Sequence, residues 1–162
     1  MSEITQKSVK KCDHTSVGMI VWNNDRLLLI ERKRFPFGFA IPAGHVDGDT
    51  SFEVAARREL EEEVGLDALK LELILDVKKD NPCRRPGGTW HHWKLYKVSV
   101  SGELSRSLDE TKQAKWFSID EIRRLAFMTE GYIAKEIADD DWEKNPGLEP
   151  VMCELFKELK FI

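Results

Sequence analysis

The sequence has few cysteines, no long apolar run and no excess of basic residues. Three widely spaced cysteines among 162 residues argue against a disulfide framework and are typical of a reducing compartment. No apolar stretch approaches the roughly 18 residues that a membrane-spanning helix needs. The net charge is −4, so we expect no non-specific binding to duplex nucleic acid or to an anionic membrane.

The rest of the composition is that of a globular protein, with 41% hydrophobic and 33% charged residues. The polar opening segment, MSEITQKSVKK, lacks the apolar centre of a signal peptide, so we expect a cytoplasmic protein. Its length favours one domain over residues 1–162. Within it we expect a flexible or edge segment at 1–12 and helices over 128–162. The oligomeric state stays open, and a homodimer is one alternative.

The most informative stretch is residues 44–66, GHVDGDTSFEVAARRELEEEVGL. At about 100° per residue, a helix here would place Glu59, Glu62 and Glu63 on one face. An apolar stripe would run beside them, consisting of Phe52, Ala56, Leu60 and Val64. Three carboxylates on one face favour a hard divalent cation such as Mg²⁺ or Mn²⁺. The alternative is a solvated acidic face that pairs with neighbouring arginines.

The same stretch resembles the Nudix box, G-x5-E-x7-R-E-U-x-E-E-x-G-U, in which U is a bulky aliphatic residue. Eight of the nine defined positions match, from Gly44 to Leu66. Thr50 is the exception, because it stands where the pattern has its early glutamate. The resemblance covers about residues 15–125. It implies an α/β/α sandwich with a mixed β-sheet between helices, in the α+β or α/β class.

The resemblance also implies a function: a metal-dependent hydrolase that cleaves the pyrophosphate bond of a nucleoside diphosphate linked to another moiety. The Mg²⁺ or Mn²⁺ ligands that it implies are Gly44, Glu59, Glu62 and Glu63. Arg58 would hold a box glutamate in place. The general base would be either Glu59 or Glu110, since members of the family differ in the residue that serves.

The departure at Thr50 keeps a second hypothesis open. Loss of the early glutamate could weaken an ion site, transfer its role to Glu53 or Asp47, or abolish turnover. The chain would then be a catalytically weak or inactive module that binds a nucleotide or metabolite. Thr50 also has a structural use, because Thr50 and Glu53 have the spacing of a helix capping box. An isomerase of isoprenoid diphosphates is disfavoured, because the sequence offers no clear cysteine–glutamate pair.

Substrate contacts would come from the loops around the motif. Arginine binds phosphate through its fork of N–H groups, and aromatic rings can stack on a base. The candidates are Arg34, Phe37, Arg84, Arg85 and His91. In a strand, His91 and His92 would point to opposite faces, so only one could line a cleft. We expect Trp90 and Trp93 to pack in the core.

A zinc site is a further alternative. It would use Cys12, His14 and Cys83 with one histidine of the His91–His92 pair. The spacing is irregular and lacks a C-x2-C pair, which argues against it.

Periodicity and turn residues predict the elements. We expect strands at 16–22, 26–31, 39–42, 71–78, 90–100 and 115–117, with the first two forming a hairpin. Helices are expected from residue 50 or 51 to Gly65, from a Ser118–Glu121 capping box to about 126, over 128–139, and over 149–159.

Overall fold

The structure of the protein is a computed structural model, which describes residues 10–162. Within these residues the strands are β1 (Thr15–Ile20), β2 (Trp22–Asn23), β3 (Arg26–Arg32), β4 (Phe39–Ala40), β5 (Ala43–Gly44), β6 (Asp67–Lys79), β7 (His91–Ser101) and β8 (Thr111–Phe117). The helices are α1 (Phe52–Val64), α2 (Ile119–Ile133), α3 (Asp139–Lys144) and α4 (Pro150–Glu158). None of these helices combines the length and apolar character that a membrane crossing requires.

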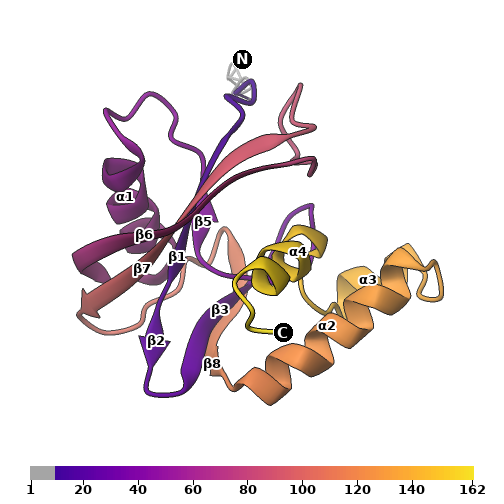
Figure 1. Cartoon of the computed structure of the whole chain (residues 1–162). Coiled ribbons are helices and arrows are strands. Elements are labelled where there is room, and N and C mark those ends of the chain that lie inside the picture. The colour runs from indigo at the N-terminus through magenta and orange to yellow at the C-terminus, as the bar shows by residue number, and fades with distance from the viewer. Residues whose placement is uncertain (1–9) are drawn as a thin grey trace, which may run out of the picture.

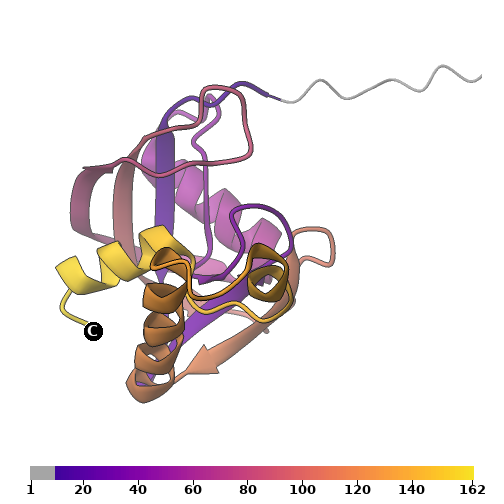
Figure 2. The ribbon, with the colours of Figure 1, turned by 90° about the vertical axis from the view of Figure 1, so that its right-hand side faces the viewer.

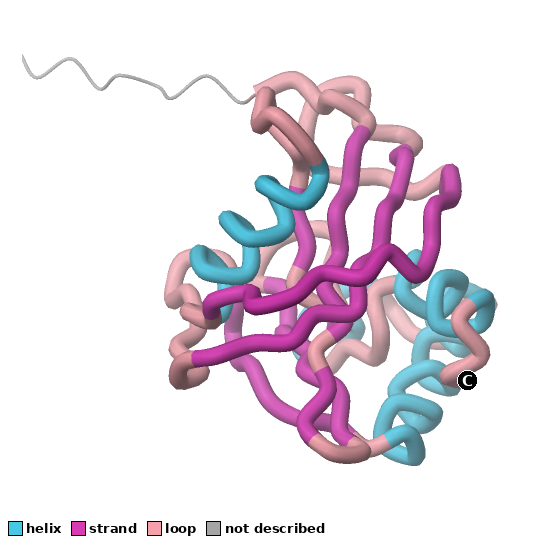
Figure 3. The backbone as a smooth tube through the Cα atoms, turned by 60° about the vertical axis from the view of Figure 1, so that its left-hand side comes forward, coloured by secondary structure: helices cyan, strands magenta, loops and turns pink. Residues whose placement is uncertain are grey.

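The strands form two four-stranded sheets. One has the order β5-β1-β7-β6, in which β1 and β7 are parallel and the other pairs are antiparallel. The other is antiparallel, with β3 between β2 and β4 and with β8 also paired to β3. Figure 3 shows the strands running between the helices. The mixed sheet that we expected is confirmed, and it is divided into two hydrogen-bonded units.

Side chains that alternate along the central strands pack into two separate hydrophobic cores. In β3, Leu28 and Ile30 belong to the core under α1, whereas Leu27 and Leu29 belong to the core under α2 and α4. Each fully buried aliphatic side chain of this kind contributes about 1.5–3 kcal/mol. In Figures 1 and 2, α1 lies on one side of the strands and α2 and α4 lie on the other. The predicted α/β/α sandwich is therefore confirmed.

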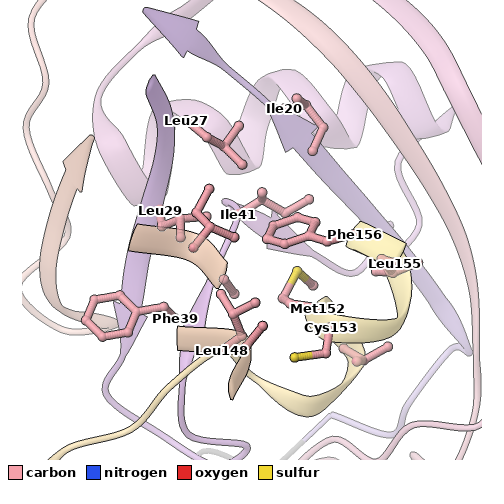
Figure 4. Close-up of a cluster of buried hydrophobic side chains, with 14 of the residues drawn as sticks. Ile20, Leu27, Leu29, Phe39, Ile41, Leu148, Met152, Cys153, Leu155 and Phe156 are labelled. Atoms are coloured by element: carbon pink, nitrogen blue, oxygen red, sulfur yellow. The ribbon is translucent and has the colours of Figure 1, made fainter. Parts of the chain in front are cut away.

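The core under α4 anchors the segment that enters the functional region. Figure 4 shows Leu29 and Ile41 packed with Met152 and Phe156. Ile41 lies between β4 and β5, so its burial fixes the chain just before Gly44. At the first residue of β4, the Phe39 N–H donates to the Gly147 carbonyl at 2.8 Å and the Phe39 carbonyl accepts from the Glu149 N–H at 2.9 Å. These bonds hold the start of α4 beside the same segment.

The predicted hairpin is confirmed at its turn, because β2 and β3 pair across a turn in which Asn24 has a positive φ of 55°. The strand expected at 16–22 is divided, however, and its first part, β1, pairs with β5 and β7 in the other sheet. Gly65 ends α1 in the left-handed conformation, and the Ser118–Glu121 capping box opens α2, both as expected. The capping box proposed for Thr50 and Glu53 is wrong. Ser51 caps α1 by accepting from the Val54 N–H at 3.1 Å, and Glu53 instead accepts from the Tyr96 hydroxyl at 2.9 Å.

Two C-terminal predictions were also wrong. α2 does not end near residue 126 but continues to Ile133, because Ile122, Ala126 and Thr129 keep one face of it buried. The separate helix expected over 128–139 is therefore absent from the described residues, and α3 follows at Asp139–Lys144. α4 agrees with its prediction. Most of the N-terminal segment predicted at 1–12 lies outside the described residues, and residues 10–12 precede β1 without regular structure.

Candidate active site

α1 directs two of its glutamates toward a cavity and a third toward solvent. Ala56 and Leu60 are fully buried against the core, and their packing fixes the rotation of the helix. Glu59 and Glu63 consequently line the cavity and are only 8% and 5% exposed. The side chain of Glu62 is 53% exposed and does not line the cavity. The expectation that three carboxylates share one cleft thus holds for two of them.

Gly44, the last residue of β5, lies directly against Glu59. A Cβ atom at position 44 would be 2.1 Å from the Glu59 Cδ and 2.3 Å from its Oε1. Only a residue without a side chain permits this close approach of backbone and carboxylate. The close contact with Glu59 therefore explains on steric grounds why the first position of the motif is glycine.

The carboxylate of Glu63 is buried and incompletely paired. Its Oε1 accepts a long hydrogen bond of 3.4 Å from the Ala43 N–H, and its Oε2 has no hydrogen-bond partner among residues 10–162. Burial raises the pKa of Glu63 well above its ordinary value, and the nearby Glu59 and Glu110 raise it further. Burial likewise raises the pKa of Glu59 to about 7, although Arg58 opposes the shift. Buried carboxylates of this kind are costly unless a cation compensates them, so this donor set fits a hard divalent ion.

Arg58 ties the helix to the loop before it. Its guanidinium donates to Asp49 at 2.8 Å, to Glu59 at 2.8 Å and to Glu62 at 3.3 Å. A fourth hydrogen bond of 2.9 Å reaches the His45 carbonyl. The sequence suggested Asp47 or Glu53 as a substitute for the missing early glutamate, but neither lines this cavity. The acidic residue that contacts Arg58 from the loop is Asp49, which we had not singled out.

The cavity collects charged residues from segments far apart in the sequence. Besides Glu59 and Glu63, its lining includes Arg32, Arg34, His45, Arg84, Arg85, His91, Glu110 and Glu149. Glu110 lies in the loop before β8 and raises the pKa of both helix glutamates by its charge. The structure therefore brings Glu110, Arg34, Arg84, Arg85 and His91 to one cavity with the motif.

Among the arginines that line the cavity, Arg85 forms an ion pair with another described residue, Asp47. Both of its terminal nitrogens donate to the carboxylate of Asp47, one of them at 2.8 Å. This hydrogen bonding lowers the pKa of Asp47. Arg84 is exposed and its guanidinium remains available to a ligand.

Phe37 does not line this cavity but a neighbouring one of about 300 Å³. The neighbouring cavity is lined by four aromatic residues, Phe35, Phe37, Tyr132 and Trp142. Tyr132 and Trp142 stack with their centroids 4.2 Å apart and their planes 5° apart. Both cavities include Pro36, Asn81, Pro82 and Glu149 in their linings, so they adjoin. Sequence reasoning had not connected the C-terminal helices with the site.

His91 and His92 point to opposite faces of β7, as predicted. His92 is bonded to Asp76, whereas His91 is 1% exposed and lies beside Cys12. Together with His45 and Cys83, these two residues form a compact cluster at one end of the cavity. Burial lowers the pKa of His45 to about 4, with a further contribution from Arg85, so its imidazole is neutral at pH 7.

His14 and Trp90 pack on each other outside the core, whereas Trp93 lies within it. His14 does not join the cysteine–histidine cluster, because it stacks on Trp90 with centroids 4.1 Å apart and contacts the Trp90 carbonyl. Trp90 is therefore not a core residue, contrary to our prediction. Trp93 is buried in the core as predicted, and its indole N–H donates to Asn81 at 3.0 Å.

The comparisons with known proteins agree with this geometry. The family model of the NUDIX domain matches residues 13–137. An ADP-ribose pyrophosphatase of Methanocaldococcus jannaschii is 33% identical over 135 residues, which cover 76% of this chain and 78% of the relative. An NAD-capped RNA hydrolase NudC of Pseudomonas aeruginosa is 31% identical over 139 residues; these cover 85% of this chain but only 47% of the relative.

Among solved structures, the NUDIX domain of Shewanella oneidensis NrtR complexed with ADP ribose matches with a TM-score of 0.65. The match covers 93% of this chain and 88% of that one at 15% identity, so it supports the fold alone. The family model and the relative at 33% identity go further, because they extend over most of the chain. The chain therefore belongs to the Nudix family, whose hydrolases use divalent cations to cleave the pyrophosphate bond of nucleoside diphosphate derivatives.

Proposed function

We propose that this protein hydrolyses the diphosphate bridge of an ADP-ribose-type substrate with the help of Mg²⁺ or Mn²⁺. The observation that carries the proposal is the pair of buried carboxylates, Glu59 and Glu63, packed against Gly44 with one Glu63 oxygen unpaired among residues 10–162. The residues that would hold the ions are Gly44 through its carbonyl, Glu59, Glu62 and Glu63. Ions bound there would offset the charge of the diphosphate and polarise the phosphoryl group toward attack by water.

Arg58 is a positioning residue in this proposal. Its four hydrogen bonds hold the Glu59 carboxylate and the loop carbonyl of His45 in fixed relation. A guanidinium suits this task because its planar fork presents several donors at once. Arg58 would therefore act on the reaction through Glu59 and not through contact with the substrate.

Glu110 is the better placed of the two candidates for the general base. Glu59 accepts a hydrogen bond from Arg58 and would also ligate an ion, so its oxygens are less free to take a proton from water. Glu110 lies in an exposed loop and lines the same cavity, so it could accept a proton from the attacking water and release it to solvent.

The arginines of the cavity would hold the phosphates. Arg32, Arg34 and Arg84 converge on the cavity from two different loops or strand ends. Arginine binds phosphate through parallel N–H groups, which orients it as well as neutralising it. Arg85 would contribute its charge from its pair with Asp47.

The neighbouring aromatic cavity would hold the nucleobase of the substrate. A purine can stack on aromatic rings, and Phe35 and Phe37 line this cavity opposite a run of residues from α2, α3 and α4. The carboxylates of Asp80 and Glu154 also line it and could accept hydrogen bonds from an amino group or from ribose hydroxyls. Because the two cavities share four residues, one substrate could span them, with its diphosphate next to the glutamates.

A product-resolved screen tests the proposal. The protein is incubated with Mg²⁺ or Mn²⁺ and a panel of ADP-ribose, NADH, nucleotide sugars, dinucleoside polyphosphates and nucleoside triphosphates, and products are separated by anion-exchange chromatography. We expect addition of one water across the bridge of ADP-ribose, giving AMP and ribose 5-phosphate. Thermal stabilisation by these compounds without any hydrolysis product would instead favour the binding module that the departure at Thr50 suggests.

A further inference from the structure

Two cysteines and two histidines meet at one end of the catalytic cavity, apart from the carboxylates of α1. The ligand atoms of Cys12, His45, Cys83 and His91 all lie within 4.8 Å of one another. The Cys12 Sγ is 3.6 Å from the His45 Nε2 and 3.4 Å from the His91 Nε2, and the Cys83 Sγ is 3.9 Å from the His45 Nε2. The Cys12 and His91 side chains are buried, and the other two are half-buried.

These separations are close to those of a tetrahedral metal site. With Zn–S bonds of about 2.3 Å and Zn–N bonds of about 2.0–2.1 Å, sulfur and nitrogen ligands of one tetrahedron lie about 3.6 Å apart. The three sulfur–nitrogen distances of 3.4, 3.6 and 3.9 Å lie around this value. A single ion at the centre of the four atoms could therefore reach all of them after small side-chain movements.

We infer that Cys12, His45, Cys83 and His91 bind one structural zinc ion. Two thiolates and two imidazoles are the ligands of structural zinc sites, and they are soft or intermediate donors that Mg²⁺ does not favour. All four coordination positions come from the protein, so the site is closed and its role is to hold the fold. It is chemically distinct from the oxygen-rich carboxylate site and does not depend on the proposed hydrolysis.

Neighbouring groups hold these side chains in a ligating arrangement. The His91 Nδ1–H donates a hydrogen bond to the Asn81 carbonyl at 3.0 Å, which leaves the Nε2 facing the Cys12 sulfur. The His14 N–H donates to the Cys12 Sγ at 3.3 Å, a contact that stabilises a thiolate. Gly88 lies so close to Cys83 that a Cβ there would be 2.1 Å from the sulfur. The turn from Cys83 to Gly88 is thus shaped around the cluster.

The ion would join the start of β7, where His91 lies, to three other segments around the cavity. Cys12 precedes β1, His45 follows β5, and Cys83 lies in the loop between β6 and β7 that also carries the cavity arginines. His45 is the residue after Gly44, so its coordination would fix the backbone on which Glu59 rests. We therefore expect loss of zinc to loosen this end of the cavity and to lower stability.

Metal analysis of the full-length protein, purified with a reductant and without chelator, tests the inference. We expect about one zinc ion per chain, retained through gel filtration. The Co²⁺-substituted protein should show the visible and thiolate charge-transfer absorption of a tetrahedral site. Stripping zinc with a chelator should lower the melting temperature by about 10 °C, since tight binding to the folded state alone stabilises it. These measurements need no substrate, so they are independent of the proposed function.

Variants separate the site from a general effect of mutation. The double variant Cys12→Ser/Cys83→Ser should lose both the zinc and the Co²⁺ spectrum. His92→Ala is the matched control, because His92 lies on the opposite face of β7 and should leave the zinc content unchanged. The inference is overturned if reduced wild-type protein, incubated with one equivalent of Zn²⁺, retains no more zinc than the double variant. It is also overturned if alkylation and mass spectrometry find Cys12 and Cys83 joined in a disulfide in freshly purified protein.

Discussion

The guanidinium of Arg58 donates a hydrogen bond to the backbone carbonyl of His45 at 2.9 Å. The same guanidinium holds the carboxylate of Glu59 at 2.8 Å. One side chain of α1 therefore fixes a metal-ligating glutamate of the proposed mechanism and the loop that carries a ligand of the inferred zinc site. This contact connects the two sites through the residue pair Gly44–His45.

Replacing Arg58 by lysine should damage catalysis more than stability. Lysine keeps the charge but cannot donate to four acceptors in a fixed plane. We expect kcat to fall by about 10–100-fold, the usual cost of losing a partner that orients a metal ligand, with KM changed less. Arg57→Lys is the control, since Arg57 is exposed and bonds the Ala68 carbonyl instead. Steady-state kinetics of both variants test this prediction. If Arg58→Lys and Arg57→Lys have equal kcat values, Arg58 does not position a catalytic group.

Glu63→Gln should nearly abolish turnover and leave the fold intact. The substitution removes a buried charge whose Oε2 has no partner among residues 10–162. The melting temperature of the metal-free variant should therefore be equal to or slightly above that of the wild type. We expect kcat/KM to fall by more than about 100-fold, because even indirect partners of metal ligands cost 10–100-fold. Glu61→Gln, on the exposed face of α1, should be neutral, and substantial activity in Glu63→Gln would exclude it as a ligand.

Phe35→Ala tests whether the aromatic cavity holds the nucleobase of the substrate. Phe35 lines that cavity and is 49% exposed, so its removal should cost little stability. Loss of one stacking ring is worth about 1–3 kcal/mol, so KM should rise roughly 5- to 150-fold with kcat nearly unchanged. Phe127→Ala removes an equally large, 77% exposed ring of α2 that lines neither cavity and should have no effect. Identical KM values for the two variants would show that the nucleobase binds elsewhere.

The buried carboxyl group of Glu149 should make the free energy of unfolding depend on pH. Burial raises the pKa of this glutamate above 4.5, and Arg32 on β3, the charged group that acts on it, lowers the pKa only in part. Below pH 4.5 the carboxyl is protonated in both folded and unfolded states and adds no cost. As the pH rises, the unfolded chain releases this proton first, so the free energy of unfolding falls until the folded pKa is passed.

Glu149→Gln should remove this cost. In thermal melts, the melting temperature of the variant should rise relative to that of the wild type as the pH increases from about 4.5 to neutrality and beyond. Glu154→Gln, on the exposed side of α4, is the control and should show a smaller difference. A constant difference in melting temperature between the Glu149 variant and the wild type at all pH values would contradict the prediction.

The sequence predicted most of the fold because its local signals agree with the packing. Alternation in β3 and the turn at Asn24 specify the hairpin, and Gly65 specifies the end of α1. The cap of α1 was mispredicted by one residue because Thr50 and Ser51 are both good caps. In the structure Ser51 is the cap, and the Glu53 carboxylate accepts from the Tyr96 hydroxyl, a tertiary partner that the local sequence does not reveal.

Fixed motif spacing predicted the part of the site whose residues are close in sequence, whereas the loop residues Arg34, Arg84, Arg85, His91 and Glu110 could be named from the sequence only as candidates. The motif gave Gly44, Arg58 and the helix glutamates, but not which glutamate faces solvent, since that depends on how Leu60 packs. The cysteine–histidine cluster joins residues up to 79 positions apart, so no spacing pattern could have revealed it. The sequence named three of its members among the zinc alternatives and missed His45.

Anomalous diffraction from crystals soaked with Mn²⁺ and a non-hydrolysable ADP-ribose analogue tests the central claim most directly. We expect anomalous peaks bounded by the oxygens of Glu59 and Glu63 and by the diphosphate of the analogue. Crystals in which these carboxylates contact only Arg58 and the Ala43 amide, with the analogue bound and no manganese between them, would contradict it.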